Sequence, residues 1–186
     1  MPNMKTKNDS HMWYGLFILA ICGGLNSKLY AEDIKVTSLK EIRERGVVMQ
    51  QWENSCAAAS IATVLTFGFA DPITERYVSL KMLEKTNPDQ VKKQGGFSLL
   101  DMKYFVEDRG YEALAFRNLS LKDLDAFNAP IVPIDHFGYH HYVVYNGTYH
   151  DKVMLADPGF GNRALTTEAF NKMWMNGMAF TVTKKK

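Results

Sequence analysis

The sequence predicts an α+β domain, in which helices come first along the chain and an antiparallel sheet follows them. From residue 37 to residue 110, polar capping residues and glycines bound stretches that favour helix. After residue 110 the pattern changes to short apolar runs bounded by Gly, Pro, Asn or Asp, which is typical of strands. Because the helices precede the strands and no internal repeat is present, the two parts are expected to pack on one core.

Each expected helix begins at a capping residue and ends near a glycine or a polar segment. The helices run from Thr37 or Ser38 to Arg45, from Asn54 or Ser55 to about Phe67, from Asp71 to about Glu84, and from Ser98 to Arg109. Asp71 is followed by a proline, which favours the first helical position. The polar segment 87–96 predicts a loop beside the functional cleft.

The second half of the chain predicts five short strands and two short helices. The strands are Tyr111–Phe116, Pro130–His136, His141–Asn146, Lys152–Ala156 and Met178–Thr183, and the helices begin at Ser120 and Thr166.

The first 31 residues predict a secretory signal peptide. Lys5 and Lys7 form a basic start, and the apolar stretch 13–25 has 13 residues, whereas a membrane-spanning helix needs about 20. Cleavage is expected after Ala31, which would place the mature chain in the periplasm. The competing interpretation is a short, uncleaved anchor in the inner membrane.

Two further features complete the expected organisation. Cys22 weakly matches a lipoprotein box, but Ile21 is bulkier than the small residue expected before that cysteine. After the leader, residues 32–46 form a lead-in, and residues 47–186 form one domain, which is long enough to bury its own core.

Composition excludes several classes of function. The chain has 22 Lys+Arg and 20 Asp+Glu, and removal of residues 1–31 leaves 19 of each. A formally neutral chain without a clustered basic face argues against nucleic-acid binding. No Gly-x-x-x-x-Gly-Lys-Ser/Thr motif is present, so no nucleotide is expected. One mature cysteine and dispersed histidines lack the close ligand pairs that zinc prefers, so neither a metal nor another cofactor is expected.

Cys56 is the one cysteine that remains after the leader, and an odd thiol in an oxidising compartment must be buried or used. It stands where a polar turn enters an alanine-rich helix, so the positive end of the helix dipole stabilises its thiolate. His141 and then Asp157 follow far downstream, in the chain order of a Cys-His-Asp hydrolase. The alternative is a buried core cysteine.

The spacing of these residues resembles a known family. Gln50 lies six residues before Cys56, and Asp157 lies sixteen residues after His141, within Asp-Pro-Gly-Phe-Gly. With the strand His-Tyr-Val-Val and the later Trp174-x-x-Gly, the chain resembles the papain-like cysteine peptidases that remove double-glycine leader peptides, the bacteriocin-processing family C-39. It departs from the family's Asp-Cys-Gly motif, since serine and alanine flank Cys56.

The resemblance implies a papain-like fold, in which the nucleophile begins a helix packed on the C-terminal sheet. It also implies that Cys56 attacks the scissile carbonyl, that His141 transfers protons, that Asp157 orients His141, and that Gln50 helps to bind the oxyanion. From the residues alone, Gln51 competes with Gln50 and His140 competes with His141; the family spacing selects Gln50 and His141.

A stand-alone, exported member is most similar to the peptidases of functional-amyloid (Fap) secretion operons. The resemblance therefore implies a periplasmic endopeptidase that cuts an exported polypeptide after Gly-Gly or another small pair. Its further expected partner is outer-membrane secretion machinery. The two alternatives are a cell-wall peptide amidase and a non-catalytic module that binds a secretion substrate.

Overall fold

The computed structural model describes residues 36–185, so the expected signal peptide, its cleavage point and Cys22 lie outside the described residues. The helices are α1 (Leu39–Glu44), α2 (Cys56–Thr63), its π-helical continuation η1 (Val64–Gly68), α3 (Glu75–Leu83), α4 (Pro88–Gln94), α5 (Leu99–Asp108), α6 (Leu121–Leu124) and α7 (Thr167–Met173). The strands are β1 (Tyr111–Phe116), β2 (Ile131–His136), β3 (Tyr139–Tyr149), β4 (Lys152–Asp157), β5 (Gly161–Thr166) and β6 (Ala179–Lys184). Over residues 36–185, no helix has both the length and the apolar character needed to cross a bilayer.

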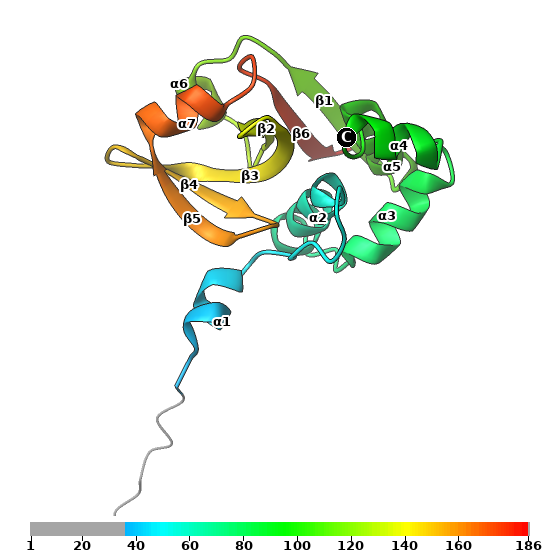
Figure 1. Ribbon diagram of the computed structural model, residues 1–186, viewed down its shortest axis with the longest axis horizontal. Coiled ribbons are helices and arrows are strands. Elements are labelled where there is room, and N and C mark those ends of the chain that lie inside the picture. The colour runs from blue at the N-terminus through cyan, green and yellow to red at the C-terminus, as the bar shows by residue number, and fades with distance from the viewer. Residues whose placement is uncertain (1–35, 186) are drawn as a thin grey trace, which may run out of the picture. The chain divides into compact units, whose positions relative to one another are not determined.

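The strands form one antiparallel sheet with the order β1-β6-β2-β3-β4-β5 (Figure 1). β3 lies inside this sheet, where Ile134 of β2 pairs with His141 on one side and Ala156 of β4 pairs with Val144 on the other. Asp157 is the last residue of β4, directly after Ala156. The register therefore brings the end of β4 close to the histidine of β3, and the α+β prediction is confirmed.

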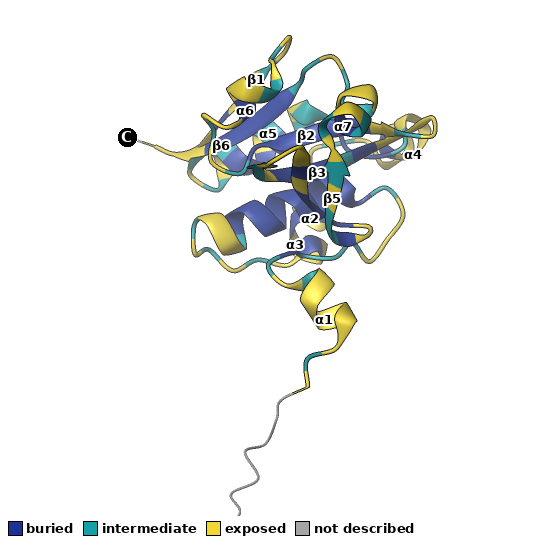
Figure 2. Cartoon of the chain, turned by 90° about the vertical axis from the view of Figure 1, so that its left-hand side faces the viewer, coloured by how far each residue is buried: buried dark blue, intermediate teal, exposed yellow. Residues whose placement is uncertain are grey.

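The sheet separates two apolar cores, because successive side chains of a strand point to opposite faces. On one face, Val144, Phe180 and their neighbours pack against α2, α3 and α5. On the other face, Val143 and Leu155 pack under α6 and α7. Figure 2 shows the buried residues concentrated in the strands and in α2, with α1 exposed.

α2 lies close to the sheet because its side chains are small. Three successive alanines from Ala57 are fully buried, and the small surface they present allows α2 to approach β3. At this contact the Ser60 hydroxyl donates to the Tyr142 carbonyl over 3.2 Å. The first residue of α2 is thereby fixed beside the strand that carries His141.

One predicted helix start and one predicted loop are wrong, and a long-range contact explains the first. α3 begins after Thr74, whose side chain accepts from the backbone of Tyr77, rather than at Asp71. The Asp71 carboxylate instead accepts a 2.7 Å hydrogen bond from Arg109, thirty-eight residues away. The segment 87–96, predicted as a loop, contains α4, with Asn87 as its N-cap and a proline at its first position.

The sequence also missed β5, which is an edge strand paired with β4. Its residues Asn162 and Arg163 interrupt the apolar pattern that identified the other strands. The Asn162 side chain contacts Arg45, 117 residues away, and the Arg163 side chain contacts Asp157 at the end of β4.

Candidate active site

Cys56 is the first residue of α2 and is 2% exposed. Its neighbour Ser55 occupies the N-cap position but forms no capping bond, since its hydroxyl donates to the Trp52 carbonyl over 2.7 Å. The first N–H groups of a helix lack intrahelical partners, so this end of α2 keeps donors near the sulfur. These donors and the positive end of the helix dipole favour a negative charge, such as an oxyanion, next to Cys56.

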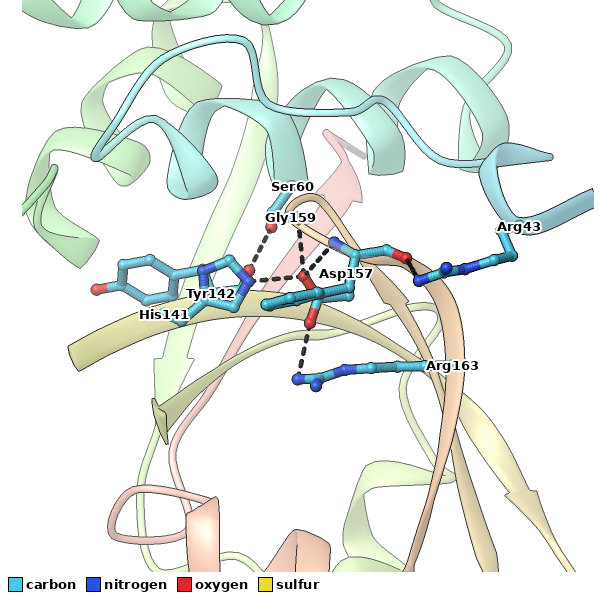
Figure 3. A network of polar contacts seen from close by, with 8 residues as sticks. Arg43, Ser60, His141, Tyr142, Asp157, Gly159 and Arg163 are labelled. Atoms are coloured by element: carbon cyan, nitrogen blue, oxygen red, sulfur yellow. Dashed lines mark hydrogen bonds and ion pairs between the residues drawn. The ribbon is translucent and has the colours of Figure 1, made fainter. Parts of the chain in front are cut away.

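His141 and Asp157 form a buried pair beside this cysteine. The His141 Nε2 lies 2.7 Å from the Asp157 Oδ1, and the exposed fractions of the two residues are 5% and 0% (Figure 3). The Cys56 side chain also acts on the His141 ring, since it contributes to the raised pKa of that ring. Because Nε2 is engaged by Asp157, the Nδ1 atom is the one left for Cys56. The structure therefore brings together the three residues that the sequence predicted as a Cys-His-Asp set.

The environment favours the charged forms of the pair. Burial acts to lower the pKa of His141, but the hydrogen bonds and negative charges of Asp157 and Cys56 raise it from 6.5 to about 9. Burial acts to raise the pKa of Asp157, yet contacts with His141, the charge of Arg163 and the Gly159 N–H hold it below its ordinary value. At neutral pH, the pair is an imidazolium and a carboxylate.

The Asp157 carboxylate has further partners that fix its orientation. Its Oδ1 accepts from the backbone N–H groups of Gly159 (2.8 Å) and Phe160 (3.3 Å). Its Oδ2 lies 2.8 Å from the Arg163 Nη2, an ion pair without the alignment of a hydrogen bond. The Arg163 guanidinium lies over the Phe160 ring at 5.2 Å. Arg163 was not predicted from the sequence, because a lone arginine on an unrecognised strand carried no signal.

α1 holds the turn that follows Asp157. The Arg43 guanidinium donates to the Phe160 carbonyl over 2.7 Å (Figure 3). The Asn162 side chain donates to the Arg45 carbonyl over 2.7 Å. Between them, Gly161 has a φ of +77°, and a Cβ there would lie 2.6 Å from the Arg43 carbonyl oxygen. Only glycine fits this close approach.

Gln50 is attached to the same turn. Its backbone N–H donates to the Pro158 carbonyl over 2.9 Å, and its Oε1 is buried without a hydrogen-bond partner among the described residues. The competing Gln51 is exposed, and its side chain donates to the Met49 carbonyl over 3.3 Å. Gln50 is therefore the better placed of the two, beside the turn that follows Asp157.

His140 and Tyr142, the neighbours of His141 on β3, line a cavity of about 200 Å³ next to Cys56. Strand alternation alone places both of them near the sulfur, so alternation does not identify the histidine that acts. The bond to Asp157 distinguishes His141, because His140 is exposed and forms no such bond among the described residues. The segment from Gln94 to Ser98, which includes the two glycines that follow α4, lines the opposite wall of this cavity.

A hydrogen bond also joins the cysteine turn to β3. The Tyr139 hydroxyl donates to the Asn54 Oδ1 over 2.6 Å, and Asn54 has a φ of 66°. Asn54 lies two residues before Cys56, so this bond holds the turn that enters α2.

Within residues 36–185, no cluster of three or more His, Cys, Asp or Glu side chains has the geometry for a metal ion.

Comparison with known proteins gives consistent matches. The model of the Peptidase C39 family matches residues 44–186. Two proteins named "Probable functional amyloid protease FapD", from Pseudomonas aeruginosa and Pseudomonas fluorescens, are 36% and 35% identical to this chain over 149 residues. These matches cover 80% of this chain but only 65% of the length of each relative.

Solved structures show the same fold. The peptidase domain of Streptococcus ComA, a bi-functional ABC transporter, superposes with a TM-score of 0.62 at 22% identity, covering 75% of this chain and 98% of that domain. A double glycine motif protease from an AMS/PCAT transporter, solved with its leader peptide, gives 0.61 at 22% identity and covers 75% and 91%. The expected papain-like fold is thereby confirmed.

Proposed function

Because the chain belongs to the peptidase C39 family, we propose that it is a cysteine endopeptidase in which Cys56, His141, Asp157 and Gln50 are catalytic. The buried His141–Asp157 pair beside Cys56 is the observation that carries this proposal, since it supplies a protonated imidazole, a general acid, at the start of α2.

The chemistry follows from the geometry. The Cys56 thiolate attacks the carbonyl carbon of the scissile amide, and the carbonyl electrons move to oxygen. The Cys56 N–H and the Gln50 side chain donate to this oxyanion. His141 gives its proton to the leaving nitrogen as the C–N bond breaks and the thioester forms. Neutral His141 then takes a proton from water, which attacks the thioester, and the thiolate and the imidazolium are restored.

The substrate that we propose is an exported protein of a functional-amyloid system, cut after Gly-Gly or another small pair. The size of the cavity at Cys56 favours a substrate with a small residue before the cut. The cavity has a volume of only about 200 Å³, and Gly95 and Gly96 form part of its wall. Gly96 lies close to the cysteine turn, since a Cβ there would be 3.2 Å from the Asn54 carbonyl oxygen. The names of the two Pseudomonas relatives support the link to amyloid secretion.

The expected signal peptide supports a periplasmic location, where the substrate passes on its way to outer-membrane secretion machinery. Cell fractionation and N-terminal sequencing of the isolated protein test this location. A chain that begins at Glu32 in the periplasmic fraction agrees with it, whereas a cytoplasmic protein beginning at Met1 contradicts it.

The test of function is cleavage by the purified chain, in reducing buffer, of candidate co-secreted proteins and of peptidoglycan fragments, with Cys56→Ala as the matched control. We expect cuts after small pairs in a protein substrate, which mass spectrometry locates, and none with Cys56→Ala. Cleavage of peptidoglycan stems alone would instead identify an amidase, and tight binding without cleavage would identify a binding module.

A further inference from the structure

α1 is an addition at the edge of the family domain. It spans Leu39–Glu44, whereas the family match begins at residue 44. Its attachment through Arg43 and the Arg45 carbonyl nevertheless reaches the turn that follows Asp157. A helix of six residues with no buried side chain contributes little to the core. Core packing therefore does not account for its position against this turn.

Between α1 and this turn lies a cavity of about 320 Å³. Leu39, Met49 and Phe160 give it apolar walls. Its α1 side carries charges of both signs, from Lys40, Arg43 and Glu44, and Lys40 and Glu44 form an ion pair at 3.9 Å. The exposed fractions of Leu39 and Phe160 are 80% and 46%, so a ligand here would cover apolar surface that is open to water. Burial of such surface favours binding, because it removes apolar surface from water.

The cavity lies next to residues that contact or precede the proposed catalytic residues. Gly159 lines it, and a Cβ on Gly159 would lie 3.6 Å from the His141 Cε1 and 3.7 Å from its Nε2. Met49 lines it as well and directly precedes Gln50. The cavity therefore adjoins the site on the side of His141, whereas the smaller cavity adjoins it at Cys56 itself.

The direction of proton transfer indicates which part of the substrate lies in each cavity. His141 protonates the leaving nitrogen, so the residues that follow the scissile bond lie on its side of the sulfur. We propose that the cavity between α1 and the turn at Gly159 binds the first residues after the cut and selects a large apolar side chain there. This inference rests on the proposed peptidase function and adds a specificity role for α1.

The test compares peptides that share the residues before the cut and carry Gly, Ala, Leu or Phe at the first or the second position after it. For the full wild-type chain, we expect kcat/KM to be about 10-fold higher for Leu or Phe than for Gly at one of these positions. In Leu39→Ala this preference, measured as the ratio of the two kcat/KM values, should fall about 3-fold to 5-fold. The matched control is Ile42→Ala, which removes a half-exposed side chain from the same helix without touching the cavity.

A second measurement isolates the leaving side. Added leucine amide and glycine amide compete with water for the same acyl-enzyme, so their relative capture reports binding on the leaving side alone. We expect leucine amide to be favoured, and Leu39→Ala to reduce this preference while Ile42→Ala does not. A wild-type chain without this preference, or an unchanged preference in Leu39→Ala, would overturn the assignment. If wild type cuts no peptide, or Cys56→Ala cuts equally well, the proposed function itself fails.

Discussion

The two sides of the site are built differently. On the cysteine side, Cys56 begins a helix whose buried face is made of alanines, and Ser55 leaves the first N–H groups uncapped. On the histidine side, the Asp157 carboxylate has contacts with His141, Arg163 and two backbone N–H groups, and α1 braces the turn. The cysteine side therefore leaves backbone N–H groups free to bind the substrate, whereas the contacts that hold His141 form before the substrate binds.

This difference has a thermodynamic consequence. The cysteine side is held by apolar packing that does not depend on the sulfur, so changes at Cys56 should affect activity alone. The histidine side joins the buried His141 and Asp157 to the partly exposed Arg163, and removal of one of these charged groups leaves another without its partner. Changes there should therefore affect both activity and stability.

The largest effect is expected for Cys56→Ala. Without the nucleophile, kcat/KM should fall by at least about 10⁴-fold, whereas the midpoint of thermal unfolding should stay close to wild type because alanine suits a buried helix position. Peptide cleavage and calorimetry measure the two quantities. A large loss of stability in this variant would show that the thiol has a packing role and would weaken the contrast between the two sides.

Asp157→Ala should lower both quantities. We expect kcat/KM to fall about 10³-fold to 10⁴-fold because His141 loses its orienting partner. The free energy of unfolding should fall by about 3–5 kcal/mol, since Arg163 and His141 would be left without their shared carboxylate. Urea denaturation measures the second change, and the exposed Asp151→Ala on the same hairpin is the control. An Asp157→Ala protein as stable as wild type would contradict the account of this side.

The next largest effect is expected for Gln50→Ala, which tests whether Gln50 is the oxyanion donor. Gln50→Ala should lower kcat by about 10²-fold to 10³-fold with a small change in KM, as the loss of one such donor typically does. Gln51→Ala should stay within about 2-fold of wild type, because the Gln51 side chain is exposed and bonds to its own loop. Steady-state kinetics on one peptide decide between them, and an equal loss in both variants would refute the choice of Gln50.

A smaller effect is expected for Arg163→Met, which removes a cation but keeps an apolar chain over Phe160. We expect kcat to fall about 10-fold because the Asp157 Oδ2 loses its ion pair. Arg163 helps to hold the pKa of Asp157 below its ordinary value, and a carboxylate with a lowered pKa adds stability that is lost as pH falls through the folded-state pKa. Acidification should therefore cost this variant less stability than wild type. Thermal unfolding between about pH 2 and pH 6 tests this, with the exposed Arg76→Met as the control.

The sequence predicted the cysteine side better than the histidine side, for a physical reason. The N-terminus of α2 is a local feature, in which a polar turn meets a run of alanines, and caps such as Ser38 and Ser98 were equally readable. The spacing of Gln50, Cys56, His141 and Asp157 predicted their association through a resemblance, which the buried geometry now supports. Local pattern alone did not distinguish His140 from His141.

The contacts that the sequence did not predict join residues far apart in the chain. Arg43 and the Phe160 carbonyl are 117 residues apart, and Arg109 reaches Asp71 across 38 residues. β5 was missed because two of its polar side chains contact residues outside the cores: Asn162 contacts Arg45, directly after α1, and Arg163 contacts Asp157. Local propensity carries no information on such partners, and tertiary contacts overrode it at Asp71.

The account depends most on a preformed imidazolium at His141, and NMR titration of its ring tests this directly. The signal that disappears in His141→Gln identifies the ring among the five histidines of the chain. A raised folded-state pKa also means that the protonated ring adds stability, fully present below about pH 6.5 and lost as pH rises through about 9. We predict that the His141 ring of the substrate-free chain titrates near pH 9 and that Asp157→Asn lowers this value. A His141 pKa at or below 6.5 in the wild-type chain would contradict the account.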